Sequence, residues 1–290
     1  MTQEKPLNIT IGLDLSEMDQ YLIQYAKILD QILSIEKITF IHNLKIGEIP
    51  KELLIPERIN QIIAKITQRI TSKIKESNHS YTFDIIVKME SYSEIAFMNL
   101  YKNQPIDLLV LGNKQELDGN GGLAHKLIRV LPCATLLVPE TFISPITTII
   151  NAIDFSRYTS LVMSWADRFE NNSKGQKITH SAVYISKFNW GFLPSMTVKD
   201  IKKETLLDID RKRNTWNQKY ALHSDIETVP AEDKSIATTL LKYCKQKKAN
   251  MLILGVKGSA GIKDIFMGSV AHDVFQRSTD TCILFVKLYK

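Results

Sequence analysis

The chain has 290 residues, of which 44% are hydrophobic and 23% are charged, which is the composition of a soluble globular protein. This length suggests two domains of ordinary size, each able to bury a core, and no apolar run approaches the ~20 residues that span a bilayer. The first ten residues lack the apolar centre of a signal peptide, and three cysteines without motif spacing give no disulfide framework. We therefore expect a cytoplasmic protein with no membrane segment.

The net charge of +6 is unevenly distributed along the chain. Residues 1–143 hold 15 Lys and Arg against 17 Asp and Glu, whereas residues 144–290 hold 22 against 14. The basic surplus of the second half favours an anionic ligand there, although a solvated surface or a weak nucleic-acid patch would look similar. Its basic residues are scattered over predicted helices without interleaved exposed aromatics, which argues against a nucleic-acid partner.

The sequence repeats once, with a period of about 140 residues. Each copy opens with an apolar strand that ends in an acid, Leu7–Asp14 and Thr148–Asp154, followed two residues later by a serine. Helix and strand patterns then alternate in the same order in both copies. The helices are predicted at 20–33, 56–76, 92–102, 160–169, 198–222 and 235–246, and the strands at 38–42, 82–87, 107–112, 178–185, 224–228 and 250–255. Each copy closes with an Ala-His pair on a helix and a last strand, 134–138 or 282–286.

Strands that alternate with helices indicate crossover connections and parallel pairing. Apolar strands such as LLVL and LILG suit a sheet that is covered on both faces. The sequence thus predicts an α/β protein with two doubly wound, five-stranded parallel-sheet domains, residues 1–143 and 144–290. The boundary is expected in Pro139–Pro145, a proline-bounded connection without a periodic pattern.

The stretch 251–287 carries the most informative motif of the chain. A short apolar strand leads into a glycine loop, a helix predicted to run to Arg277, and a second apolar strand. The spacing is Gly255-x2-Gly258-x9-Gly268-Ser269. Glycines let a ligand approach the backbone closely, and N–H groups at a loop and a helix start bind phosphate. The plainer alternative is a tight turn in which Ser269 serves only as the helix cap.

This spacing resembles the ATP-binding signature of the universal stress protein family, and the repeat makes the whole chain resemble a tandem member of it. No Gly-Lys-Ser/Thr run marks a P-loop, and no glycine fingerprint of a dinucleotide site follows the strand that ends at Asp154. The resemblance implies the adenine nucleotide alpha hydrolase-like fold, with strand order 3-2-1-4-5 in each domain. Ligands of such sheets bind at the switch point between strands 1 and 4.

The resemblance also implies roles for individual residues of the second half. Asp154 would contact the nucleotide near its adenine and ribose, although it could instead cap the next helix, as could Ser156. Val183 would present backbone groups to adenine, although its side chain alone suggests core. The residues that would hold ribose and phosphates are Gly255, Gly258, Gly268, Ser269 and Val270. Mg²⁺ would arrive with the ATP, since no carboxylate cluster offers a metal cage.

The first half departs from this motif. Gly112 is followed by Asn-Lys-Gln115, without a glycine at the second motif position. The next helix start, Gly121-Gly122, comes about four residues early, and Gly122 stands where the serine belongs. Asp14 is retained, but the loop is degenerate, and we expect one nucleotide per chain.

The sequence offers little for catalysis. None of the six histidines has zinc spacing, and no serine or cysteine has an adjacent base with an orienting acid. The leading prediction is a regulatory ATP-binding protein of the stress response, not an enzyme, with slow or no hydrolysis. The alternatives are a nucleotide-independent interaction scaffold and an adenylyl-transferring enzyme, and the protein partner stays unknown.

The last strands of the two copies, 134–138 and 282–286, are both apolar. Domains of the family commonly pair about a two-fold axis through these strands. A fused repeat would let one chain satisfy both open edges. The resemblance therefore implies an intramolecular pseudo-dimer of the two domains, packed face to face.

Overall fold

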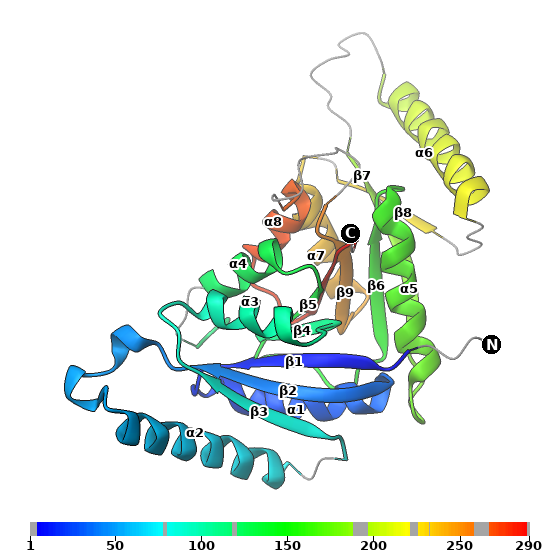
Figure 1. The fold of residues 1–290 in the computed structure, drawn as a ribbon. Coiled ribbons are helices and arrows are strands. Elements are labelled where there is room, and N and C mark those ends of the chain that lie inside the picture. The colour runs from blue at the N-terminus through cyan, green and yellow to red at the C-terminus, as the bar shows by residue number, and fades with distance from the viewer. Residues whose placement is uncertain are drawn as a thin grey trace.

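The computed structural model describes residues 5–77, 80–117, 121–187, 197–220, 226–231, 233–257 and 267–288. Within them the chain alternates strands and helices (Figure 1). The strands are β1 (Leu7–Leu13), β2 (Ile35–Asn43), β3 (Phe83–Lys88), β4 (Leu108–Gly112), β5 (Ala134–Val138), β6 (Thr148–Ile153), β7 (Thr179–Ser186), β8 (Ile226–Pro230), β9 (Met251–Gly255) and β10 (Cys282–Val286). The helices are α1 (Met18–Ile32), α2 (Pro56–Glu76), α3 (Ser93–Asn103), α4 (Gly122–Val130), α5 (Arg157–Asn172), α6 (Val198–Tyr220), α7 (Ile236–Gln246) and α8 (Ser269–Phe275). Two 3₁₀ turns, η1 (Ile46–Glu48) and η2 (Lys51–Leu53), precede α2.

The strands form one sheet of ten, in the order β3-β2-β1-β4-β5-β10-β9-β6-β7-β8. The α/β class and the parallel pairing are confirmed, and each half runs 3-2-1-4-5 when its own strands are counted. The predicted face-to-face packing of the halves is wrong, because β5 and β10 pair antiparallel and join the two five-stranded halves edge to edge in one sheet. An edge strand offers unpaired N–H and C=O groups, and this pairing satisfies both edges within one chain.

The seam between β5 and β10 is buried. Ile283 pairs with Leu137, Leu284 with Leu136 and Phe285 with Thr135, and all six residues are at most 1% exposed. One core cluster packs under α1, α2 and α5, and the other under α3, α4, α7 and α8. Both clusters contain residues of both halves, so the core continues across the seam.

An acid or amide before strand 4 of each half has a structural role. The Asp107 carboxylate accepts a hydrogen bond from the backbone N–H of Asn8 at 2.8 Å. The Asn250 side-chain oxygen accepts from the backbone N–H groups of Thr147 and Thr148, at 2.9 and 3.0 Å. These repeated side chains therefore hold the start of strand 1 against strand 4, which brings the ends of those strands together at the opposite side of the sheet.

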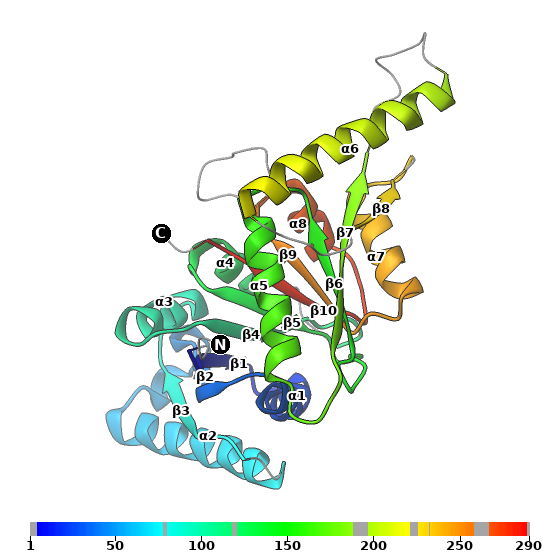
Figure 2. The same cartoon turned by 90° about the vertical axis from the view of Figure 1, so that its right-hand side faces the viewer.

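Helix α6 departs from the helix that it repeats. Helix α2 buries Ile70 and Ile74 and packs against β3. Helix α6 buries Ile209 and Trp216 but leaves Leu206 60% exposed, and it extends away from the sheet (Figures 1 and 2). The indole of Trp216 donates to the carbonyl of Ser156 at 3.4 Å. Among the described side chains, Ile209 and Trp216 in the C-terminal part of α6 thus connect the helix to the rest of the fold.

Two further features bear on the expectations from the sequence. Among the residues that the structure describes, no helix has the length and apolar character needed to cross a membrane. The thiols of Cys133, Cys244 and Cys282 are free and buried, and burial raises the pKa of each to about 12. A thiol with such a pKa carries almost no thiolate at neutral pH, so these cysteines are packing residues and not nucleophiles.

Candidate functional site

The turn between strand 1 and helix 1 has the same construction in both halves. In the second half, Asp154 Oδ1 accepts from the backbone N–H of Ser156 at 3.0 Å, and Ser156 Oγ accepts from that of Tyr158 at 3.2 Å. Ser156 is therefore the N-cap of α5, and Asp154 fixes the turn that places it. The residue between them, Phe155, has a φ of 59°, as Leu15 of the first half has 63°.

A cavity of about 480 Å³ opens at the carboxyl ends of β6, β7 and β9. Parallel strands 1 and 4 diverge to their crossovers at this point, which is where open α/β sheets bind ligands. Six of the seven residues that the sequence singled out line this cavity: Asp154, Val183, Gly255, Gly268, Ser269 and Val270. Gly258 lies outside the described residues. The structure thus brings together residues up to about a hundred positions apart in the chain.

The two described motif glycines have different local roles. A Cβ on Gly255 would lie 2.8 Å from Tyr158 Cβ and 2.9 Å from the Lys257 carbonyl oxygen, so packing of α5 alone demands glycine here. Gly268 has an ordinary φ of −64°, and its N–H donates to the Val256 carbonyl at 2.8 Å. The loop is therefore closed by a backbone bond just before α8. Helix α8 ends at Phe275, earlier than the predicted Arg277.

Ser269 and Val270 form the first turn of α8. The first N–H groups of a helix have no partner within the helix. The Gly268 N–H is engaged, and the first-turn N–H groups at this wall of the cavity, which have no acceptor within α8, are those of Ser269, Val270 and Ala271. Val183 lies within β7 between β6 and β8, and its side chain is buried.

Three lysines line the cavity that sequence reasoning did not select: Lys187, Lys212 and Lys257. They follow β7, lie on α6 and follow β9, and Asp154 is the one acid among the described lining residues. Lys212 pairs with Asp208 at 2.6 Å, and its Nζ lies 6.0 Å from the centroid of the Tyr184 ring. The hydrogen bond to Asp208 raises the pKa of Lys212, so this side chain is charged at neutral pH. The basic surplus of the second half was the only sequence signal for them.

The cavity also has an aromatic and an apolar wall. The rings of Phe155 and Tyr184 lie 5.1 Å apart between centroids at an interplanar angle of 51°. Both residues line the cavity beside Val183, Leu240 and Leu254. A concave site with apolar walls and a few convergent cations suits a ligand that joins a flat ring to an anionic group.

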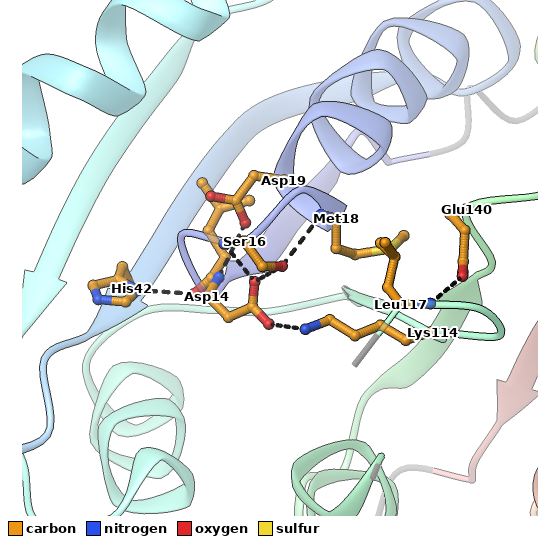
Figure 3. Close-up of polar contacts among 9 residues, drawn as sticks. Asp14, Ser16, Met18, Asp19, His42, Lys114, Leu117 and Glu140 are labelled. Atoms are coloured by element: carbon orange, nitrogen blue, oxygen red, sulfur yellow. Dashed lines mark hydrogen bonds and ion pairs between the residues drawn. The ribbon is translucent and has the colours of Figure 1, made fainter. Parts of the chain in front are cut away.

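In the same region of the first half, an ion pair joins the ends of strands 1 and 4 (Figure 3). Lys114 Nζ lies 2.8 Å from Asp14 Oδ2. A Cβ on Gly112 would lie 2.5 Å from Met18 Cγ. Helix α4 begins at Gly122 after Gly121, whose φ is 61°. The degenerate motif of the first half therefore accompanies an ion pair between the residues that follow strands 1 and 4.

The continuous α/β sheet, with a cation-lined cavity at a strand switch point, places the protein in the doubly wound class. Residues 145–285 match the family model described as Universal stress protein family, and the chain belongs to this family through that half. It is 30% identical over 80 residues to Universal stress protein YxiE of Bacillus subtilis (strain 168), an alignment that covers 28% of this chain. The chain spans about half the length of the curated relatives it matches.

Two solved structures share the fold over nearly the whole chain. A universal stress protein from Archaeoglobus fulgidus DSM 4304 has a TM-score of 0.65 at 12% identity, covering 97% of this chain and 98% of that one. A functionally unknown protein from Pseudomonas aeruginosa PAO1 has a TM-score of 0.66 at 11% identity, with coverage of 97% and 92%. Since each likeness spans both halves, the fold of residues 1–143 is also one that occurs in known proteins.

Proposed function

We propose that the second half binds ATP, and that the protein acts in the cytoplasm as a regulatory nucleotide-binding protein of the stress response. The observation that carries this proposal is the cavity at the ends of β6 and β9, in which three lysines and six motif residues converge. The family membership of residues 145–285 supports the stress-response role. The three buried free thiols support a reducing compartment.

The residues present fit an adenine nucleotide. In this proposal the triphosphate lies toward the lysines and the amides of Ser269 and Val270, where opposite charge and N–H donors favour it. The adenine and ribose lie between Asp154 and Val183, beside the rings of Phe155 and Tyr184. Gly258 would complete the loop around the phosphates. Mg²⁺ would accompany the nucleotide, and in the described part of the chain no three His, Cys, Asp or Glu side chains group as metal ligands.

Slow or no hydrolysis is part of the proposal. A general base must reach the attacking water with a lone pair to spare. Asp154, the acid among the described lining residues, lies in this proposal beside the adenine and ribose and not beside the phosphates, so it is not placed to activate the attacking water. ATP would then act as a ligand that biases conformation or partner choice, and not as a substrate that is turned over.

Replacing Gly268 by valine tests this site. ATP should raise the melting temperature of the wild-type protein, since a ligand that binds only the folded state stabilises it by about 2.7 kcal/mol at a hundred times its Kd. Gly268→Val should weaken ATP binding by about 1–3 kcal/mol, because a side chain would enter the cavity where phosphate meets α8. Gly47→Val is the control, because a Cβ there meets no atom within 4 Å.

Calorimetric titration of ATP into the folded variants gives the affinities. Wild-type affinity in folded Gly268→Val would place the phosphates elsewhere. No ATP effect on the wild-type melting temperature would favour the nucleotide-independent scaffold.

We further propose that residues 1–143 and 144–290 are two domains that form an intramolecular pseudo-dimer. The antiparallel pairing of β5 with β10 supports it, as does the core that crosses the seam. A protease site inserted between Phe142 and Ser144 should give, after cleavage, two fragments that co-elute in size-exclusion chromatography, because the contact is core-like. Fragments that elute as separate, soluble monomers would contradict the pseudo-dimer.

A further inference from the structure

The loop after β4 of the first half wraps a carboxylate of its own chain. Glu140 Oε1 accepts hydrogen bonds from the backbone N–H groups of Gln115, Glu116 and Leu117, at 2.9, 2.6 and 3.0 Å. Its second oxygen, Oε2, accepts from Gln115 at 3.0 Å. Figure 3 shows the Glu140 side chain directed at Leu117 from the segment after β5. Three successive amides that converge on one oxygen are the arrangement by which a backbone nest binds an anion.

The charge state of Glu140 agrees with this geometry. Burial by itself would raise the pKa of its carboxyl, but hydrogen bonds from the backbone of Glu116, Glu140 itself, Leu117 and Gln115 outweigh burial and hold the pKa below its ordinary value. The group is therefore ionised at neutral pH. A carboxylate with a lowered pKa stabilises the fold above its unfolded pKa and loses that contribution as the pH falls through the folded value.

The second half has no acid at the matching position. Strand β4 pairs Gly112 with Val138, and β9 pairs Gly255 with Val286. Glu140 stands two residues after Val138, and the residue two after Val286 is Leu288. The half that keeps the glycine motif thus lacks the internal carboxylate, and the half that lost the motif has it.

We propose that the first half contains an anion site for a carboxylate, and that its resident ligand is the chain's own Glu140. In the proposed site of the second half, the loop after strand 4 would bind a free anion. In the first half, the loop after strand 4 binds the carboxylate of Glu140 instead. A small free carboxylate should bind to the three amides of Gln115, Glu116 and Leu117, which we call the amide nest, once the Glu140 side chain is removed.

Residues of the amide nest and its ligand segment also form hydrogen bonds to the second half of the chain. Gln115, whose N–H binds Glu140, accepts with its side-chain oxygen from the backbone N–H of Thr279 at 3.1 Å. Thr141, the residue after Glu140, donates its hydroxyl to Asp280 at 2.6 Å. Thr279 and Asp280 lie between α8 and β10. Glu140 therefore holds together the loop after β4 and the segment after β5. Both of these segments form hydrogen bonds to the turn that follows α8, the helix of the candidate ATP site.

Chemical rescue of Glu140→Ala tests the proposal in the full chain. The variant should melt on the order of 3–8 °C below the wild type, and sodium formate or acetate should restore part of that loss, relative to sodium chloride at equal ionic strength. Wild-type protein and Glu116→Ala should show no carboxylate-specific rise. Glu116 is the control because its side chain is an exposed acid on the same loop and its N–H remains. Equal carboxylate effects on all three proteins would overturn the proposal.

A measurement on the wild-type protein covers the case in which Glu140→Ala fails to fold. In an acid titration followed by ¹H–¹⁵N NMR, the amide signals of Gln115, Glu116 and Leu117 should shift together, with one midpoint below the ordinary glutamate pKa of about 4.3. Independent midpoints, or no shift before unfolding, would contradict a shared carboxylate ligand. Neither experiment uses nucleotide, so its outcome is separate from that of the ATP proposal.

Discussion

Replacing Phe285 by alanine should lower the free energy of unfolding by about 3–5 kcal/mol, the cost of truncating a buried phenylalanine. Phe285 is 0% exposed and lies in β10 opposite Thr135 of β5. It belongs to the core cluster that contains residues of both halves. A cavity at this position weakens the packing of each half and the seam between them. Urea denaturation of the full chain measures the change.

The matched control is Leu206→Ala on α6. Leu206 is 60% exposed, so its truncation should change stability by no more than about 0.5 kcal/mol. If the halves are coupled through the seam, Phe285→Ala should also lower the stability of the first half, read from hydrogen exchange of β4 and β5 amides. Loss confined to the second half would show that the two halves unfold independently.

Replacing Lys187, Lys212 and Lys257 together by glutamine should weaken ATP binding by about 3–5 kcal/mol, or roughly 10²–10⁴-fold in Kd. Each lysine lines the cavity, and a hydrogen bond from a charged donor contributes about 1.5–3 kcal/mol. The three losses add only in part, since the side chains would share one triphosphate. Adenosine, which lacks the phosphates, should lose far less affinity than ATP.

The control removes three lysines of the same half that lie outside the cavity: Lys177, Lys242 and Lys245. This variant has the same net charge as the site variant, so any difference between them comes from position and not from long-range charge. Equal loss of affinity in both would mean that a diffuse field attracts the nucleotide. Unchanged affinity in both variants would show that Lys187, Lys212 and Lys257 do not contribute to ATP binding.

Hydrophobic periodicity predicted the elements well, because burial on both faces of the sheet leaves a strong pattern. The bounds of α2 agree with the predicted helix 56–76, and strands 4 and 5 of each half fall where the apolar runs lie. The single ten-stranded sheet was not predicted. Apolar last strands indicate that the sheet edge is buried by another part of the protein. They do not indicate whether that part packs face to face or pairs edge to edge.

Helix α6 shows where periodicity fails. It is close in length to α2, with 23 residues against 21, yet Ile209 and Trp216 are the only buried ones among its described side chains. A helical pattern specifies the helix but not the surface that it covers. The sequence alone therefore could not place Lys212 at the cavity.

Some residues of the candidate site could be predicted from the sequence, and others could not. The glycine motif and Asp154 are local patterns that a sequence displays, so they could be selected in advance. Lys187, Lys212 and Lys257 come from three separate elements, and only the fold brings them together. Glu140 stands in a plain Pro-Glu-Thr stretch, and nothing in that stretch says that three amides of another loop surround its carboxylate.

The stoichiometry of ATP binding tests the central claim most directly. Calorimetric titration of ATP into the full chain should give one site per chain, because the cavity lies in the second half, whereas in the first half Lys114 pairs with Asp14 and Glu140 occupies the amides of the loop after β4. Gly268→Val should weaken that site, and Lys114→Gln should leave it unchanged. Two equivalent sites per chain, or a single site that Lys114→Gln weakens while Gly268→Val does not, would contradict the account.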